Sequence, residues 1–150
     1  MSVSARYVHK QLDRALEDVG TLDALQNEVY TVGNPGYGWA ATFYPPGGSS
    51  PIPFPKAKRD YDAVEIGVDR RLSGRWSARA SYTWSRLYGN YSGLAQSDED
   101  GRVSPNYGRN FDYPLMAFDE SGEPAYGVLA TDRPRQLKAQ VLFDFAFGAS

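Results

Sequence analysis

The chain has 150 residues, of which 41% are hydrophobic and 23% are charged, and its formal net charge is −2. This length allows one domain with a core, and the near balance of charge does not indicate nucleic-acid binding. The lack of any run of about 18 apolar residues excludes a transmembrane helix, and the absence of cysteine excludes disulfides and thiolate metal sites.

The first predicted strand covers residues 2–14, where Val3, Ala5 and Tyr7 alternate with mostly polar positions. A period of two is typical of a strand with one apolar face. Residues 16–60 follow as a predicted long outer loop. Together with a second stretch, residues 87–134, this loop contains all ten prolines and 12 of the 15 glycines. Such a composition predicts that neither stretch can be a regular element.

Two alternating strands, residues 61–72 and 76–86, are joined by a predicted periplasmic turn at residues 73–75. Two registers fit: Leu72 opposite Trp76, or Arg71 opposite Arg75 with Gly74 as the left-handed residue of a bulged turn. Both registers place even positions opposite even positions. In either one, Asp69 comes close enough to Arg79 for a cross-strand ion pair.

The positions of the aromatic residues favour a membrane over a soluble sandwich. Trp76 lies at the turn end, whereas Tyr82 and Trp84 lie at the far end, with small or aliphatic residues between them. This pattern is typical of two aromatic girdles flanking an apolar band. Arg70, which interrupts the apolar side, is interpreted as snorkelling to the turn-side interface. The hairpin alone also fits a half-buried strand pair in a soluble β protein.

The last predicted strand covers residues 135–147 and carries the clearest apolar stripe, which ends in three phenylalanines. With this strand included, the alternation of apolar and polar residues predicts which side chains face lipid and which face the lumen of a barrel. The predicted lipid-facing wall is Val64, Ile66, Val68, Trp76, Ala78, Tyr82, Trp84, Val141, Phe143 and Phe145. The predicted lumen-facing residues are Glu65, Asp69, Arg79, Ser81 and Thr83.

The order of long and short connections completes the expected fold. We predict an all-β chain, an antiparallel meander of about four transmembrane strands with two long outer loops and one short periplasmic turn. The loops contain 13 aromatic residues, so some of them must pack. Four strands cannot close a barrel, because about eight is the smallest closed membrane form. The chain is therefore expected to be a segment of a larger barrel, with two sheet edges that are unpaired when it is alone.

A family resemblance rests on several motifs in and beyond the third strand. The motifs are Ser81-Tyr82-Thr83-Trp84-Ser85-Arg86, Gly89-Asn90-Tyr91-Ser92-Gly93-Leu94, Ser104-Pro105-Asn106 and Asp132-Arg133-Pro134. With them the chain resembles the TonB-dependent outer-membrane receptors, in particular the Oar-like group that carries a carboxypeptidase-regulatory-like domain. The resemblance covers nearly all 150 residues, as a segment of the C-terminal half of the barrel.

The resemblance implies a barrel of about 22 strands closed by a plug, which imports a scarce ligand across the outer membrane of a Gram-negative bacterium. The expected partners are lipid, lipopolysaccharide, the remainder of the barrel, its plug and, through the plug, an inner-membrane energy-coupling complex. This sequence contains neither plug nor coupling box. Two alternatives remain open: a soluble extracellular β module that binds glycans, and a passive porin or adhesion barrel.

Candidate sites are few in this sequence. Trp39, Tyr91, Tyr107 and Tyr113 could stack on a planar ligand, although such loop aromatics more often hold a loop together. The acidic run at residues 98–101 lacks the later ligands of a calcium loop, and we interpret it as a solvated loop. His9 is the only histidine, which excludes a multi-histidine metal site, and no catalytic motif is present. No enzyme activity and no cofactor are expected.

Overall fold

The computed structural model describes residues 1–44, 50–93, 95–99, 102–105, 111 and 117–145. In this part of the chain every regular element is a strand, except for the short 3-10 helix η1 (Gly38–Ala41). The strands pair antiparallel, which confirms the all-β prediction. Across the described ranges, no helix is long and apolar enough to cross a membrane.

The chain forms two compact units. We call the first the strand unit; it comprises Met1–Lys10, Tyr61–Leu87 and Asp132–Ser150. We call the second the loop unit; it comprises Gln11–Asp60 and Tyr88–Thr131. The strand unit holds most of the predicted spanning segments, and the loop unit holds most of the predicted outer loops.

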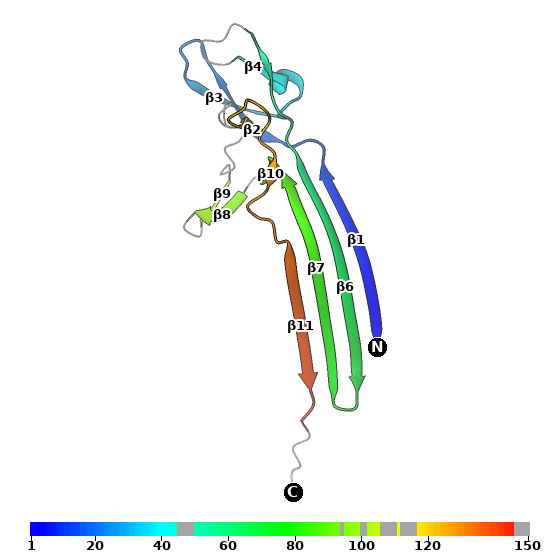
Figure 1. The fold of residues 1–150 in the computed structure, drawn as a ribbon. Coiled ribbons are helices and arrows are strands. Elements are labelled where there is room, and N and C mark those ends of the chain that lie inside the picture. Colours follow the sequence, from blue (N-terminus) through cyan, green and yellow to red (C-terminus); the bar gives the residue numbers. More distant parts are fainter. Residues whose placement is uncertain (45–49, 94, 100–101, 106–110, 112–116, 146–150) are drawn as a thin grey trace. The chain divides into compact units, whose positions relative to one another are not determined.

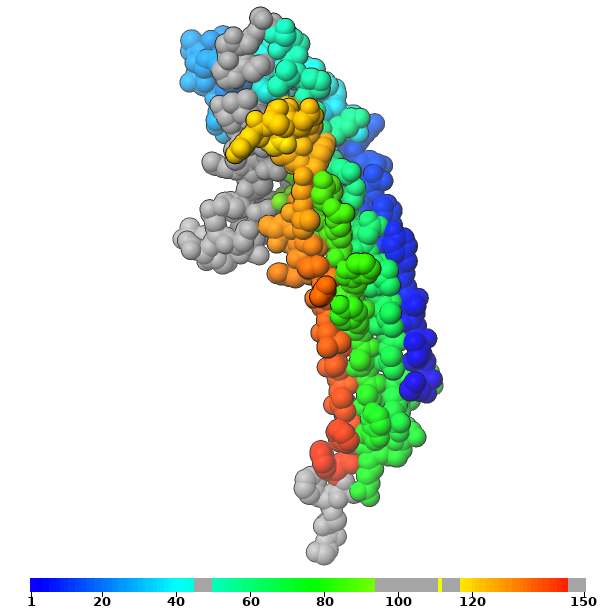
Figure 2. All heavy atoms as spheres, in the orientation of Figure 1, coloured from blue at the N-terminus to red at the C-terminus, as the bar shows by residue number. Residues whose placement is uncertain are grey.

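The sheet of the strand unit contains four long strands in chain order, as Figure 1 shows. They are β1 (Ser2–Leu12), β6 (Arg59–Ser73), β7 (Trp76–Gly89) and β11 (Arg135–Phe143). β6 pairs with β1 on one side and β7 on the other, and β11 pairs with β7, which is the predicted meander. In the space-filling view these strands form a continuous surface from β1 to β11 (Figure 2).

The strand bounds differ from the predicted ranges at several ends. β1 ends at Leu12 rather than at residue 14, and β11 ends at Phe143 rather than at residue 147. Just beyond β11, the Asp144 N–H donates to the Arg75 carbonyl at 2.8 Å. Because Arg75 lies in the β6–β7 turn, β7 offers β11 no further partner residues.

The register between β7 and β11 places apolar residues opposite apolar residues. Phe143 lies opposite Trp76, and Val141 lies opposite Ala78. Farther along the same face, Leu137 lies opposite Tyr82. Such cross-strand pairs are the unit of sheet stabilisation, each contributing roughly 0.2–1 kcal/mol relative to an alanine pair. The apolar stripe is therefore continuous across this strand pair.

The turn between β6 and β7 is shorter than predicted, because Ser73 belongs to β6 and only Gly74 and Arg75 lie between the strands. Gly74 has φ +73°, a left-handed conformation that costs glycine little. The predicted ion pair is confirmed, since Arg79 Nε donates to Asp69 Oδ2 at 2.8 Å.

The loop unit contains several short strand pairs, so the prediction of two stretches without regular elements is wrong. β2 (Glu17–Leu22) pairs with β3 (Glu28–Gly33), and β4 (Thr42–Phe43) pairs with β5 (Ile52–Pro53). β8 (Ala95–Glu99) pairs with β9 (Arg102–Pro105), and β10 (Gly127–Val128) pairs with the end of β7. Prolines are accommodated because Pro53 and Pro105 lie at strand ends.

Aromatic and small apolar residues form the core of the loop unit. The buried members are Ala15, Val19, Ala40, Phe43, Phe54, Ala57, Tyr91, Phe111 and Ala117. The Phe54 ring lies 5.8 Å from the Phe43 ring and 6.0 Å from the Phe111 ring, measured between centroids. The core joins residues from both predicted loops, which confirms that loop aromatics pack.

We predict that Phe111→Ala destabilises this core by about 3–5 kcal/mol, because it leaves a cavity where a ring is fully buried. Phe111 is 1% exposed. In the complete protein, hydrogen exchange of the β2 and β4 amides should become much faster. The control is Leu25→Ala, at a side chain that is 82% exposed, which should leave exchange unchanged. Equal exchange in the two variants would contradict the assignment of this core.

Candidate functional site

The apolar face of the strand unit is open to solvent in this chain. Val64, Ile66 and Val68 on β6 are exposed, and so are most predicted wall residues on the neighbouring strands. Trp84 is 64% exposed and Phe143 is 56% exposed, whereas Trp76 and Ala78 are half-buried. Soluble monomers rarely expose apolar patches larger than a few hundred Å². A surface of this kind is suited to contact lipid or protein.

Aromatic rings gather at the turn end of this face. The rings of Trp76 and Phe143 stack with their centroids 6.4 Å apart, and Phe143 lies 6.2 Å from Phe145. The Arg70 guanidinium lies 3.8 Å from the centroid of the Trp76 ring, a cation–π contact. Arg70 therefore places its guanidinium over the Trp76 ring at the turn end of the stripe.

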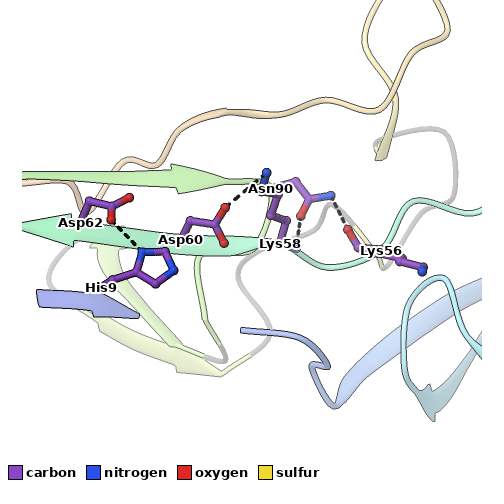
Figure 3. A network of polar contacts seen from close by, with 6 residues as sticks. All are labelled: His9, Lys56, Lys58, Asp60, Asp62 and Asn90. Atoms are coloured by element: carbon purple, nitrogen blue, oxygen red, sulfur yellow. Dashed lines mark hydrogen bonds and ion pairs between the residues drawn. The ribbon is translucent and has the colours of Figure 1, made fainter. Parts of the chain in front are cut away.

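Polar side chains around Asp62 lie at the opposite end of the apolar face. Asp62 is two residues before Val64 on the same strand. The Tyr7 hydroxyl donates to Asp62 Oδ1 at 2.6 Å. His9 Nδ1 lies 2.7 Å from the same oxygen (Figure 3). Arg86 adds electrostatic attraction to this carboxylate. Aromatic and charged groups thus mark both ends of the apolar stripe.

The other face of the sheet is polar, and on β6 it is less exposed than the apolar face. Of its predicted lumen-facing residues, Glu65, Asp69, Ser81 and Thr83 are half-buried and Arg79 is exposed. Arg6 Nη2 donates to Glu65 Oε2 at 2.7 Å, which parallels the Arg79–Asp69 pair. Exposed pairs of this kind stabilise a fold by about 1 kcal/mol at most. In a soluble domain the apolar face would be the sheltered one.

Asn90, the residue directly after β7, connects two segments of the loop unit, and we call this connection the anchor. Its side chain accepts a hydrogen bond from the Lys58 N–H at 2.7 Å and donates to the Lys56 carbonyl at 3.1 Å (Figure 3). Asn90 is buried, so these bonds satisfy an amide that would otherwise be costly to bury. The Lys58 ammonium pairs with Asp60 at 3.2 Å.

Gly89 allows the backbone at the end of β7 to lie close to the backbone of Lys58 at this anchor. Its φ is +152°, and a Cβ there would lie 1.9 Å from the Lys58 carbonyl oxygen. Any other residue would clash with backbone that cannot swing aside.

The four candidate ligand-contact residues are placed differently by the structure. Trp39 is 51% exposed, whereas Tyr91 is only 9% exposed and packs on Phe111. Burial raises the pKa of the Tyr91 hydroxyl, and the nearby Glu17 carboxylate adds to this effect. Tyr91 is therefore a core residue, which corrects its prediction as a ligand contact. Tyr107 and Tyr113 lie outside the described residues.

The acidic turns have structural roles where the structure describes them. Asp119 Oδ1 accepts hydrogen bonds from the Ser121 hydroxyl at 2.6 Å and from the Glu123 N–H at 3.1 Å. The bond from the Ser121 hydroxyl is the main reason why the pKa of Asp119 is lowered. Among the described residues no group of three or more possible ligands could hold a metal ion. The predicted acidic loop at residues 98–101 lies partly outside them.

An open pocket in the loop unit surrounds Trp39. Its volume is about 380 Å³, and the residues that line it include Arg14, Leu16, Val32, Asn34, Tyr37 and Trp39. Except for Trp39, these residues were not among the sequence candidates. The local pattern carries no signal for them, because they come from three separate parts of residues 14–39.

Comparisons with known proteins agree with this geometry. A family model described as an outer membrane beta barrel domain matches residues 1–150. Over 136 residues the chain is 37% identical to the TonB-dependent transporter Oar of Myxococcus xanthus, an alignment that covers 91% of this chain and 11% of that protein. The chain thus spans about a tenth of the length of this curated relative. No solved structure matches the chain.

We predict that Gly89→Ala loosens the anchor of the loop unit, because the new methyl group meets the Lys58 carbonyl and the backbone loses a favourable glycine conformation. Limited proteolysis of the complete protein on intact cells should cleave residues 11–60 faster than in the wild type. Gly127→Ala is the matched control, since Gly127 pairs with Gly89 and a Cβ there meets nothing within 4 Å. Cleavage of Gly89→Ala at the wild-type rate, as expected for Gly127→Ala, would contradict the role of this anchor.

Proposed function

Because this chain belongs to the outer membrane β-barrel family, we propose that it forms wall and outer loops of an energy-coupled receptor that imports a scarce ligand. The similarity to a TonB-dependent transporter supports this proposal. It also supports a location in the outer membrane of a Gram-negative bacterium and a role other than catalysis.

One observation carries the proposal: the inversion of polarity between the two faces of the strand unit. On β6 the apolar side chains of Val64, Ile66 and Val68 are exposed, whereas Glu65 and Asp69 on the opposite face are half-buried. A lipid-facing wall with a hydrated lumen requires this arrangement. We propose that these two faces are the lipid-facing and lumen-facing surfaces predicted from the sequence. Aromatic groups at both ends fit the two membrane interfaces.

The proposed partners follow from the two edges of the sheet. Within the described part of the chain, β1 pairs only with β6, and β11 pairs only with β7. We propose that neighbouring strands of the barrel pair with both edges, because an open edge would leave backbone polar groups unsatisfied in lipid. Lipid and lipopolysaccharide would cover the apolar face. A plug elsewhere in the complete protein would contact the inner-membrane coupling complex.

We predict that Ala80→Arg in the complete protein impairs folding into bilayers by about 2–4 kcal/mol, because it places a charge on the lipid face near the midplane. Ala80 lies opposite Ala139, in the middle of the β7–β11 pairing. The matched control is Ser81→Arg, one residue along on the polar face, which should fold like the wild type. A gel-shift assay of folded against heat-unfolded barrel measures both variants. Normal folding of Ala80→Arg would count against the assigned orientation.

Energy coupling separates the proposal from a passive porin or adhesion barrel. We predict that the complete protein, purified from outer membranes, binds the periplasmic domain of the TonB coupling protein in a pull-down. A variant of the complete protein that lacks the region N-terminal to the barrel should lose this binding. An intact barrel that shows no binding would support the passive alternative.

A further inference from the structure

The pocket around Trp39 has a rigid aromatic floor. The Trp39 indole packs directly on the backbone of Gly33, since a Cβ on Gly33 would lie 2.5 Å from an indole carbon. One side of the indole is thus covered by backbone, and the side chain still remains 51% exposed. A flat group held in this way loses little conformational freedom on binding, so it is well suited to stack on a planar partner.

The walls of the pocket are apolar and open. Leu16 is 65% exposed and Val32 is 66% exposed, and both line the pocket next to Trp39. Its volume of about 380 Å³ falls in the range of small-molecule sites. A ligand with an apolar body could therefore remove three solvent-exposed side chains from water at once.

The charge of the pocket is positive. Arg14 is the one cation among the described residues that line it, and none of them is acidic. The Arg14 guanidinium lies 5.1 Å from the centroid of the Tyr37 ring, and the Lys56 ammonium lies 4.6 Å from the same centroid. The Tyr37 hydroxyl donates to the Asp13 carbonyl, which fixes the ring that orients both cations. A guanidinium held on a ring can still bind a carboxylate through its N–H groups.

We propose that this pocket binds a small organic anion with a flat apolar body, in the class of aromatic carboxylates. The flat body stacks on Trp39 between Leu16 and Val32, and the carboxylate pairs with Arg14. The inference rests on the proposed receptor function, for which it names the class of ligand. A neutral sugar would use the indole but not the guanidinium, so charge complementarity favours the anion.

The probe is 2-naphthoate, titrated calorimetrically into the complete protein in lipid nanodiscs, with empty nanodiscs subtracted. We expect saturable binding that is at least about tenfold tighter than that of the neutral 2-naphthamide, because only the anion forms the charge-assisted hydrogen bonds. Absence of naphthoate binding, equal binding of the amide, or binding of glucuronate in place of naphthoate would overturn the inference.

Variants locate the binding in this pocket. Arg14→Gln should weaken naphthoate binding at least about tenfold, whereas Arg14→Lys should retain part of it. Val32→Glu should weaken binding by like-charge repulsion, and its exposed position leaves the fold intact. Tyr44→Ala is the control, because Tyr44 is 66% exposed in the same unit and does not line the pocket. Unchanged binding in Arg14→Gln and Val32→Glu would overturn the inference.

The outcome is separable from that of the proposed function. If the complete protein folds into bilayers and binds the coupling protein but not naphthoate, the ligand assignment fails and the receptor function stands. If naphthoate binding depends on Arg14 but the complete protein does not bind the coupling protein, the pocket assignment stands and the import function fails.

Discussion

The register between β7 and β11 is the constraint on which the rest of the structure depends. It places Val141 opposite Ala78 and Phe143 opposite Trp76, so that one face is apolar along its length. A slip of one residue would turn the β11 stripe to the polar face, because side chains alternate with a period of two. The stacking of Trp76 on Phe143 and the continuity of the apolar stripe across β7 and β11 follow from this alignment.

The outer connections have a different physical basis. Their strands are only two to six residues long, too short to be stable alone. A shared core of phenylalanines and alanines stabilises them, and the bonds of Asn90 connect two of their segments. In the same unit Trp39 packs on Gly33 and lines the open pocket.

The strands could be predicted from the sequence because alternation is a local signal, and the Asp69–Arg79 pair followed from the hairpin alone. The turn at Gly74 was predicted one residue too long, since strand ends depend on backbone pairing that the side-chain pattern does not specify. The loop core could not be predicted, because it joins residues as far apart as Ala15 and Ala117. The Trp39 pocket could not be predicted either, because it depends on how three short segments of residues 14–39 fold together. Tyr91 shows this limit: the sequence does not tell a buried ring from an exposed one.

The central claim is that the even positions of β7 face lipid. These residues include no cysteine, and in a cysteine-free background of the complete protein single cysteines introduced at residues 77–84 can each carry a spin label. Accessibility to oxygen and to a water-soluble nickel complex, measured by electron paramagnetic resonance in bilayers, tests the claim directly. We predict a period of two, with oxygen favoured at even positions and nickel at odd positions. Nickel accessibility at Ala78, Ala80 and Tyr82, or no alternation, would contradict it.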